Sequence, residues 1–353
     1  MSSKATPSRS PDEVRAILAL TLIAEVGSVK HRHLSERFRS AAHALDAAFP
    51  PGVKAKAYAD ADEFLRLAER RGLRLTTPLD ANYPPSLLEL HDPPATVWSR
   101  GSWSTLRAPL VAVVGTRRAT SYGQRITREL AGALARAGAC VVSGMAHGID
   151  AYAHRAALDA TGNTIAVLGN GADVVYPRAN TALYREIVER GLVLSELPPG
   201  IRSGAWAFPR RNRIIAGLCR LTIVVEAPKH SGALNTSKHA LELGRDVAAV
   251  PGPVDSPQSE GANELIRDGA HAITSVADAL ALLGLEAPVK IAPELRGADE
   301  ERVWNALVDG SATLDELCTR TTLPVAKCMA AVTALELRKV VECALTGEIR
   351  RRN

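Results

Sequence analysis

The sequence predicts an α/β fold built on a doubly wound parallel sheet, with a small module on either side. The middle of the chain alternates apolar runs of strand length with helical stretches, which is typical of an extended Rossmann-like sheet covered by helices. The residues before it are rich in Ala and Leu at helical spacing. The last residues follow the order helix, turn, helix, helix and two short strands, which predicts a winged-helix-like module.

We place the boundaries where the composition changes. Residues 1–75 form a helical module after a disordered tail, 76–285 form the sheet domain, 286–298 are a linker, and 299–353 form the winged-helix-like domain. In the helical module, apolar spacing on both sides of Val26-Gly27-Ser28 predicts two helices joined by a tight turn, of the helix-hairpin-helix or SAM-like kind. The basic run 30–33 that follows either contacts a DNA backbone or is a solvated face.

Six strands are expected in the sheet domain, and their near-continuous hydrophobicity implies burial on both faces. The prolines between residues 76 and 109 indicate a linker or wrapping segment before the first strand. The strands are expected at 110–115, 140–143, 164–168, 192–196, 221–226 and 246–250. Helices are expected at 122–137, 151–160, 181–190 and 235–243.

Each predicted strand ends in a cluster of small residues. Ligands of parallel α/β sheets bind outside the carboxyl ends of the strands, so these loops should converge on one cleft. Gly144 and Gly171 lie in two of the loops, where glycine lets backbone amides approach phosphate oxygens closely. Arg117 and Arg118 lie in a third.

The stretch 195–217 carries the strongest local signal for an anionic ligand. Arg210, Arg211 and Arg213 stand where a helix is expected to begin, and helix starts attract phosphate. Phe208 lies just ahead and could stack on a base. An alternative remains open, in which Phe208 belongs to the core and the arginines pair with acidic neighbours such as Glu196 or Glu226.

Ser231 and Gly232 open a further helix and could either cradle an anion or only cap that helix. Lys238 lies about one turn inside, where it could reach the same cleft or simply be a surface lysine.

Composition narrows the function classes. The formal net charge of +5 is compatible with an anionic partner. The start of the chain lacks the apolar core of a secretory signal, and no apolar run approaches the length that spans a bilayer, so we expect a cytoplasmic protein without a membrane partner. Five scattered cysteines without CxxC spacing favour free thiols over zinc or disulfides.

Several motifs of enzymes are incomplete. The run GNGADV after the third predicted strand lacks the last glycine of a dinucleotide fingerprint, and a P-loop pattern is missing, so we expect no cofactor. Asp150 and His154 stand four residues apart on one helix, but a third metal ligand is missing and helix capping by Asp150 explains the pair better. We therefore expect no catalytic residue and no metal site.

The succession of motifs closely resembles the DNA-processing protein DprA family, also called Smf, over residues 80–283. The motifs are VAVVGTRRATSYG, SGMAHGID, GNGADVVYP, SELPPG, FPRRNRIIAG, VVEA, SGALNTS, GRDVAAVPG and EGANELIRDGA. The resemblance implies a dimeric, non-catalytic protein that binds single-stranded DNA during natural transformation and loads the RecA recombinase onto it.

Carried over by motif, the resemblance puts Arg117 on the DNA backbone and Phe208 against a base, with Arg211 and Arg213 nearby. Asn212 and the loops that contain Gly144 and Gly171 would complete the cradle. Two departures concern loop geometry: SGALNT replaces the usual SGSLIT, and a proline often found after PPG is missing.

Two other functions compete with this one. A nucleotide hydrolase of the related phosphoribohydrolase-like fold would need a PGGxGTxxE loop, which this chain lacks. A winged-helix regulator would need selectivity for duplex DNA.

Overall fold

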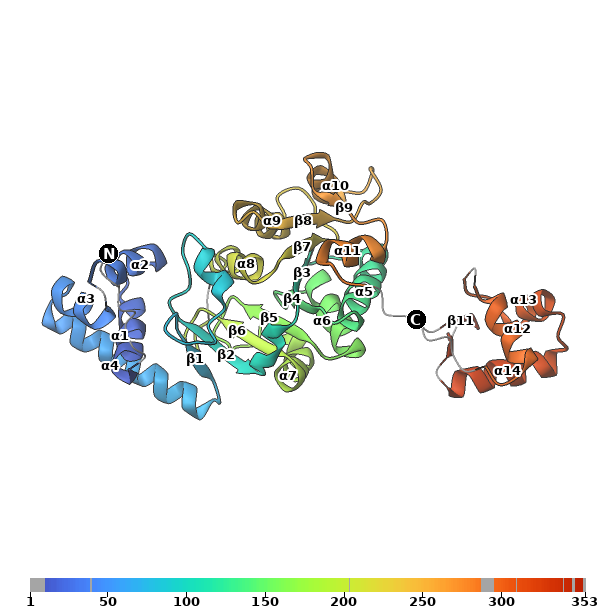
Figure 1. Ribbon diagram of the computed structural model, residues 1–353, viewed down its shortest axis with the longest axis horizontal. Coiled ribbons are helices and arrows are strands. Elements are labelled where there is room, and N and C mark those ends of the chain that lie inside the picture. The colour runs from blue at the N-terminus through green and yellow to red at the C-terminus, as the bar shows by residue number, and fades with distance from the viewer. Residues whose placement is uncertain are drawn as a thin grey trace. The chain divides into compact units, whose positions relative to one another are not determined.

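The computed structural model describes residues 10–38, 40–202, 204–286, 295–308, 310–338, 340–344 and 347–351. The chain forms two compact units, residues 1–288 and 289–353, and each is described by itself (Figure 1). The predicted disordered tail and most of the predicted linker at 286–298 lie outside the described residues. The helical module at 1–75 belongs to the same unit as the sheet.

Four helices open the first unit: α1 (Pro11–Leu22), α2 (Ser28–Phe38), α3 (Ala41–Ala48) and α4 (Pro51–Arg70). The Ser10 hydroxyl caps α1 by accepting the backbone N–H of Glu13. The buried Glu13 carboxylate in turn accepts the N–H of Ala41 at 2.5 Å, which fixes the start of α3 against α1. The two helices predicted around residues 26–28 are confirmed.

A nine-stranded sheet follows, in the order β1-β2-β6-β5-β4-β3-β7-β8-β9. Its strands are β1 (Arg74–Thr76), β2 (Val97–Gly101), β3 (Leu110–Val114), β4 (Cys140–Ser143), β5 (Thr164–Leu168), β6 (Leu192–Ser195), β7 (Leu221–Val224), β8 (Asp246–Ala249) and β9 (His271–Ala272). All six predicted strands are present and run parallel to one another.

The sheet continues beyond the predicted strands at both edges. The segment 76–109, expected to be a linker or a wrapping segment, is not a linker, because β2 pairs antiparallel with β6 and β1 pairs antiparallel with β2. Two short 3-10 helices, η1 (Pro85–Glu89) and η2 (Trp103–Arg107), flank β2. The prolines of this stretch lie on both sides of β2 and none lies in it. A proline-rich stretch favours the prediction of a loop, which is why β2 was not predicted. They include the prolines at 84, 85, 93, 94 and 109.

Helices cover both faces of the sheet (Figure 1). One face packs against α5, α6 and α11, and the other against α8, α9 and α10. The helices, with the short η3, are α5 (Ser121–Arg136), α6 (Ile149–Ala160), η3 (Arg178–Asn180), α7 (Thr181–Arg190), α8 (Ala207–Leu218), α9 (Gly232–Glu242), α10 (Glu260–Arg267) and α11 (Val276–Leu283). The sheet is therefore doubly wound, as expected.

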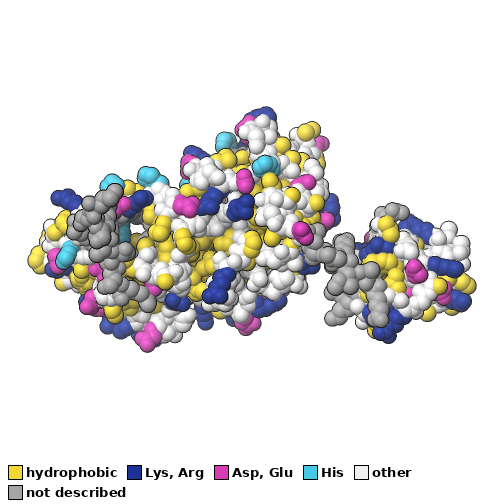
Figure 2. Space-filling view, viewed as in Figure 1, with side chains coloured by type: hydrophobic (Ala, Val, Ile, Leu, Met, Phe, Trp, Pro, Cys, Tyr) yellow, Lys and Arg dark blue, Asp and Glu magenta, His cyan; other side chains and the backbone are white. Residues whose placement is uncertain are grey.

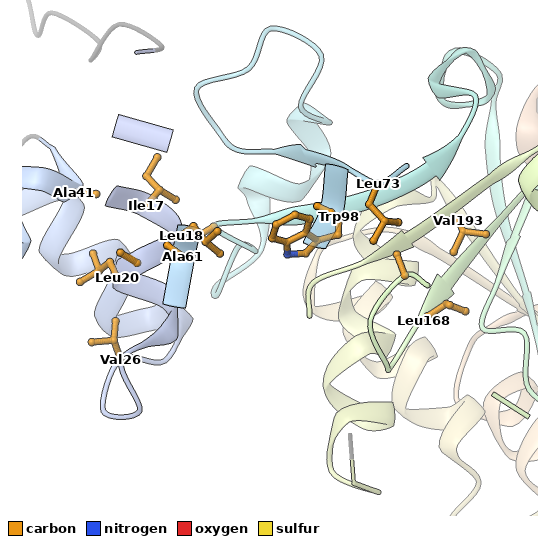
Figure 3. Packing of buried hydrophobic residues seen from close by; sticks show 14 of the residues in the cluster. Ile17, Leu18, Leu20, Val26, Ala41, Ala61, Leu73, Trp98, Leu168 and Val193 are labelled. Carbon is orange, nitrogen blue, oxygen red and sulfur yellow. The ribbon is translucent and has the colours of Figure 1, made fainter. Parts of the chain in front are cut away.

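Trp98 on β2 joins the helical module to the sheet. Its fully buried indole lies in one apolar cluster with Leu18 and Ala61 of the helices and with Leu168 and Val193 of the sheet (Figure 3). The four helices are thus packed onto the sheet by this side chain and its neighbours.

The second unit contains α12 (Ala298–Ala306), α13 (Leu314–Thr321), α14 (Val325–Leu337), β10 (Val341–Cys343) and β11 (Ile349–Arg351). The strands pair antiparallel, and Ala312 bridges to Ile349, which completes a winged-helix arrangement. Thr313 forms a capping box at the start of α13. The predicted turn residue 309 and the strand turn at 346 lie outside the described residues.

The surface does not present one continuous basic stripe on the face drawn in Figure 2. Lys and Arg side chains alternate there with Asp and Glu, and apolar side chains surface between them. An anionic partner must therefore be recognised by local sites on this face rather than by a uniform field. Among the described helices, none is both long and apolar enough to cross a bilayer.

We predict that Trp98→Ala lowers the free energy of unfolding of the first unit by about 3–5 kcal/mol, because it leaves a cavity between the helices and the sheet. Trp98→Phe should cost much less, since it keeps most of the ring and removes a buried indole N–H that has no partner among the described residues. Urea denaturation of both variants measures the difference. Equal losses would contradict the packing role.

A second prediction concerns acid stability. Burial lowers the pKa of His31 to about 4 from its usual 6.5, against an opposing hydrogen bond to the backbone of Ile17. As the pH falls from about 6.5 to 4, His31 binds a proton in the unfolded chain but stays neutral in the folded chain. The free energy of unfolding should therefore fall by on the order of 3 kcal/mol between pH 6.5 and 4.

Denaturation at a series of pH values checks this sign. His31→Gln should flatten the pH dependence in this window, whereas His33→Gln, at an exposed position on the same helix, should leave it as in the parent. A slope unchanged in His31→Gln would refute the assignment.

Candidate nucleic-acid interface

A cleft of about 370 Å³ opens where the strand order reverses. β4 lies on one side of β3 and β7 on the other, so the loops after β3 and β7 part at this point and leave a crevice. Gly115 and Arg117 follow β3, and Ser231 and Gly232 follow β7. The cleft is lined by these four residues and by Val114, Ala146, Asp150, Ala205, Phe208, Pro209, Arg211, Asn212, Ile215, Ala233 and Thr236.

Two rings and one guanidinium form a row at the cleft. The Arg117 guanidinium carbon lies 5.3 Å from the centroid of the Phe208 ring, within range of a cation–π interaction. On the same ring packs Tyr176, with centroids 5.5 Å apart and planes tilted by 37°. Tyr176 is 51% exposed and Arg117 is also exposed, so both remain available to a ligand.

The Phe208 ring can occupy this position because Gly169, next to it, has no side chain. A Cβ atom on Gly169 would lie 3.0 Å from the ring, so a larger residue there would displace Phe208. Sequence reasoning missed Tyr176, although an aromatic in a loop that follows a strand is a usable signal in a chain with few aromatics.

Arg211 forms the floor of the cleft and is only 7% exposed. Its guanidinium donates to the carbonyl oxygens of Gly144, at 2.8 Å, and of Val167, and its Nε–H donates to the Asn212 side chain. Burial lowers the pKa of Arg211 to about 10, so the group stays charged at neutral pH. Gly144 is required here, because a Cβ atom would collide with the guanidinium.

Asp150 supplies the charge that offsets Arg211. Burial raises the pKa of Asp150, while Arg211 and the backbone N–H groups of Ala146 and Gly144 oppose that rise. Both N–H groups donate to the carboxylate, so Asp150 shapes the loop 144–148 rather than capping α6 as expected from the sequence. Met145 in this loop has φ of 56°, a strained value that its surroundings must hold in place.

The third wall is the start of α9. The Ser231 hydroxyl accepts the N–H of Ala233, and Asn212 donates to the carbonyl oxygen of Gly232 at 3.0 Å. A side chain added at Gly232 would meet open space, so the start of α9 is not covered by other parts of the described chain at this residue. Thr236 lies one turn further in and also lines the cleft. These features suit contact with an oxygen-rich anion.

The structure corrects where the arginines lie on α8. The helix begins at Ala207, earlier than expected, so Arg210 ends its first turn and Arg213 lies in the second. Arg213 is 3% exposed and pairs with Asp92 and Glu196, at 2.8 Å each. Burial by itself lowers the pKa of Arg213, but the two carboxylates outweigh it and raise the pKa overall.

Arg210 also pairs with Glu196, at 3.2 Å. The alternative in which arginines of this stretch bind Glu196 is thus confirmed for Arg210 and Arg213. Glu226, the other candidate partner, instead accepts the N–H and hydroxyl of Thr120.

Four further residues from the sequence prediction do not line the cleft. Arg118 is exposed next to Arg117, and Gly171 is buried, where its N–H donates to the carbonyl oxygen of Ile201. Lys238 is exposed beside Glu242, with 4.0 Å between the charged atoms. Gly144 lies behind the cleft, where it binds the lining residues Arg211 and Asp150 through its backbone.

Catalytic and metal chemistry find little support in the described part of the chain. The buried His154 ring binds the Thr164 hydroxyl at 2.7 Å, and burial lowers the pKa of His154 to about 3. His154 is therefore a neutral core residue at physiological pH. Within the described ranges, no group of three or more His, Cys, Asp or Glu side chains is placed to hold a metal ion.

Comparisons with known proteins match both parts of this chain to one family. Residues 74–284 match the family model for DNA recombination-mediator protein A, and residues 286–344 match that for the DprA winged helix domain. A putative DNA processing protein DprA of Mycobacterium tuberculosis is 39% identical over 300 residues, which cover 79% of this chain and 77% of that protein. The DprA of Streptococcus pneumoniae is 46% identical over 203 residues, or 58% of this chain and 72% of that protein.

Two solved structures are similar. The X-ray structure of DprA from S. pneumoniae matches with a TM-score of 0.66 and 36% identity, over 78% of this chain and 98% of that one. The DNA processing protein A from Helicobacter pylori, whose structure addresses its single-stranded DNA binding mode, matches with a TM-score of 0.55 and 32% identity, over 60% and 95%. The chain described here belongs to the DNA recombination-mediator protein A family, also known as DprA or Smf.

Proposed function

We propose that this chain binds single-stranded DNA in the cleft, without catalysis, and loads the RecA recombinase onto the strand during natural transformation. The observation that carries the proposal is the row of Arg117, Phe208 and Tyr176 at the mouth of the cleft. Stacking rings next to a cation bind unpaired bases and phosphates with little sequence preference. The H. pylori relative is described as binding single-stranded DNA, which supports the same ligand here.

The cleft favours an unpaired strand over a duplex for a physical reason. The exposed Tyr176 ring and the half-buried Phe208 ring beside it can bind a base only by stacking, and in a duplex each base is already stacked between its neighbours. A single strand offers its bases at much lower cost. Arg117, beside the rings, is then placed to contact the adjoining phosphate.

The cations of the cleft take different roles in this proposal. Arg117 contacts DNA directly, since it is exposed. Arg211 and Asn212 are positioning residues, because their hydrogen bonds go to the protein. We no longer propose direct contact for Arg213, whose guanidinium is buried between two carboxylates.

The hydrolase alternative loses support from the same geometry. Asp150, the acidic residue that lines the cleft, is buried and bound by two backbone N–H groups. Glu226 is held by Thr120. A general acid or base must reach the substrate, and neither carboxylate is free to do so.

RecA loading and a homodimer are proposed on the family resemblance. The homodimer can be tested by measuring the mass of the full chain in solution. Light scattering of the full chain should give twice the chain mass of 37.5 kDa. A chain mass equal to one copy at micromolar concentration would contradict the dimer.

We predict that Phe208→Ala weakens binding to a single strand by about 1–3 kcal/mol for each base it stacks. Arg117→Ala should weaken binding for all sequences and reduce the slope of log affinity against log salt by about 0.7, because one phosphate contact is lost. Fluorescence anisotropy with a labelled oligonucleotide over a salt series measures both effects.

Arg220→Ala is the matched control. Arg220 is exposed and directly precedes β7, at the edge of the sheet opposite the cleft. Its loss should leave affinity and slope close to those of the parent. If Arg117→Ala behaves like Arg220→Ala, the cleft is not the site.

RecA loading gives a separate prediction. The chain should shorten the lag before RecA assembles on a single strand, measured by DNA-dependent ATP hydrolysis, and Phe208→Ala should lose most of this effect because it holds less DNA. A lag that the parent leaves unchanged, with strand binding intact, would remove RecA loading from the proposal and keep the binding.

A further inference from the structure

A second basic pocket lies where α4 meets β2 and the loop after β5. It measures about 500 Å³ and is lined by Arg70, Arg71, Gly72, Arg100 and Asp173. Three arginines face one carboxylate there, so the lining carries an excess of positive charge. Neither the sequence motifs nor the cleft accounts for this pocket.

Its carboxylate is already engaged. The Asp173 side chain is 4% exposed, forms an ion pair with Arg71, and accepts the N–H of Gly200 at 2.9 Å. A buried carboxylate satisfied in this way fixes Arg71 in place. Asp173 cannot at the same time neutralise the other two arginines.

Those two arginines are the groups available to a ligand. Arg100 contacts the Tyr184 hydroxyl, which donates to the carbonyl oxygen of Ala172 and so anchors the loop after β5. Arg70 is exposed at the end of α4, and its guanidinium makes no ion pair with any described residue. The pocket is thus a preorganised site with one free guanidinium at its rim.

A short loop connects this pocket with the cleft. Both ends of the loop lie beside Phe208, since Gly169 at its start and Tyr176 near its end contact the ring. Asp173, which binds Arg71, precedes Tyr176 by three residues, so their Cα atoms are at most about 11 Å apart. The pocket and the stacked rings are therefore joined by one loop, and a strand whose base stacks at Phe208 would reach Arg70 by following that loop.

We propose that the phosphates of a single strand leaving the cleft bind in this arginine pocket. The inference rests on the proposed function of the cleft and extends it, since the path of the strand would then cross from the sheet domain to the helical module. Phosphate is the fitting ligand, because arginine side chains that converge on one point recognise its oxygens in more than one direction.

The test compares two labelled oligonucleotides, of about 4 and about 16 nucleotides, binding to the full chain. Arg70→Ala should weaken the longer probe several-fold and reduce its salt slope by about 0.7. The shorter probe, which fills only the cleft, should bind as to the parent. Arg70→Glu should weaken the longer probe further, because a carboxylate repels phosphate. Both variants should keep the melting temperature of the parent, since Arg70 is exposed.

Two controls separate this inference from the function of the cleft. Phe208→Ala should weaken both probes, and Arg220→Ala should weaken neither. If Arg70→Ala matches Arg220→Ala on the longer probe while Phe208→Ala still weakens it, the pocket inference is overturned and the cleft stands. If the parent binds neither probe, the proposed function itself fails, and the pocket with it.

A free phosphate compound is the other ligand that could bind in the arginine pocket. Calorimetric titration with inorganic pyrophosphate distinguishes it from DNA. Pyrophosphate binding that Arg70→Ala abolishes, together with unchanged affinity for the longer probe, would overturn the assignment to a DNA strand.

Discussion

The buried guanidinium of Arg211 is the constraint on which the cleft depends. A cation removed from water is tolerated only if hydrogen bonds and an opposite charge replace its hydration. Here the carbonyl oxygens of Gly144 and Val167 accept from it, and Asp150 supplies the charge. Arg211 of α8 is thereby held against β5, the start of α6 and the loop after β4, and its carbonyl partners lie 44 and 67 residues before it in sequence.

The arginines of this region fall into a buried group that binds the protein itself and an exposed group that we propose binds DNA. Those that hold the scaffold are buried with their partners, as Arg211 is with Asp150 and Arg213 is with Asp92 and Glu196. Those proposed to hold DNA, Arg117 and Arg70, are exposed. A rigid floor lets the exposed groups act without first being ordered, which lowers the entropic cost of binding a flexible strand.

Most of the sheet could be predicted from sequence, whereas the roles of the arginines could be predicted only as two open alternatives. Continuous apolar runs reveal buried parallel strands, but β2, with the sequence VWSRG, is apolar only at its start and is framed by prolines. Arg213 and its partner Asp92 are 121 residues apart, and Arg211 and Gly144 are 67 apart, so local spacing carries no trace of either contact. Phe208 and Arg117 were predicted through their motifs, whereas Tyr176 lies inside the motif GNGADVVYP but was not predicted to act with them, because its contact with Phe208 joins residues 32 apart.

The most direct test of a cleft built for unpaired bases is a competition in solution. A labelled single strand bound to the full chain is displaced by unlabelled strand or by the same sequence as a duplex, at one fixed salt concentration. The account predicts that the single strand displaces the label at far lower concentration than the duplex does. Equal displacement, or preference for the duplex, would contradict it.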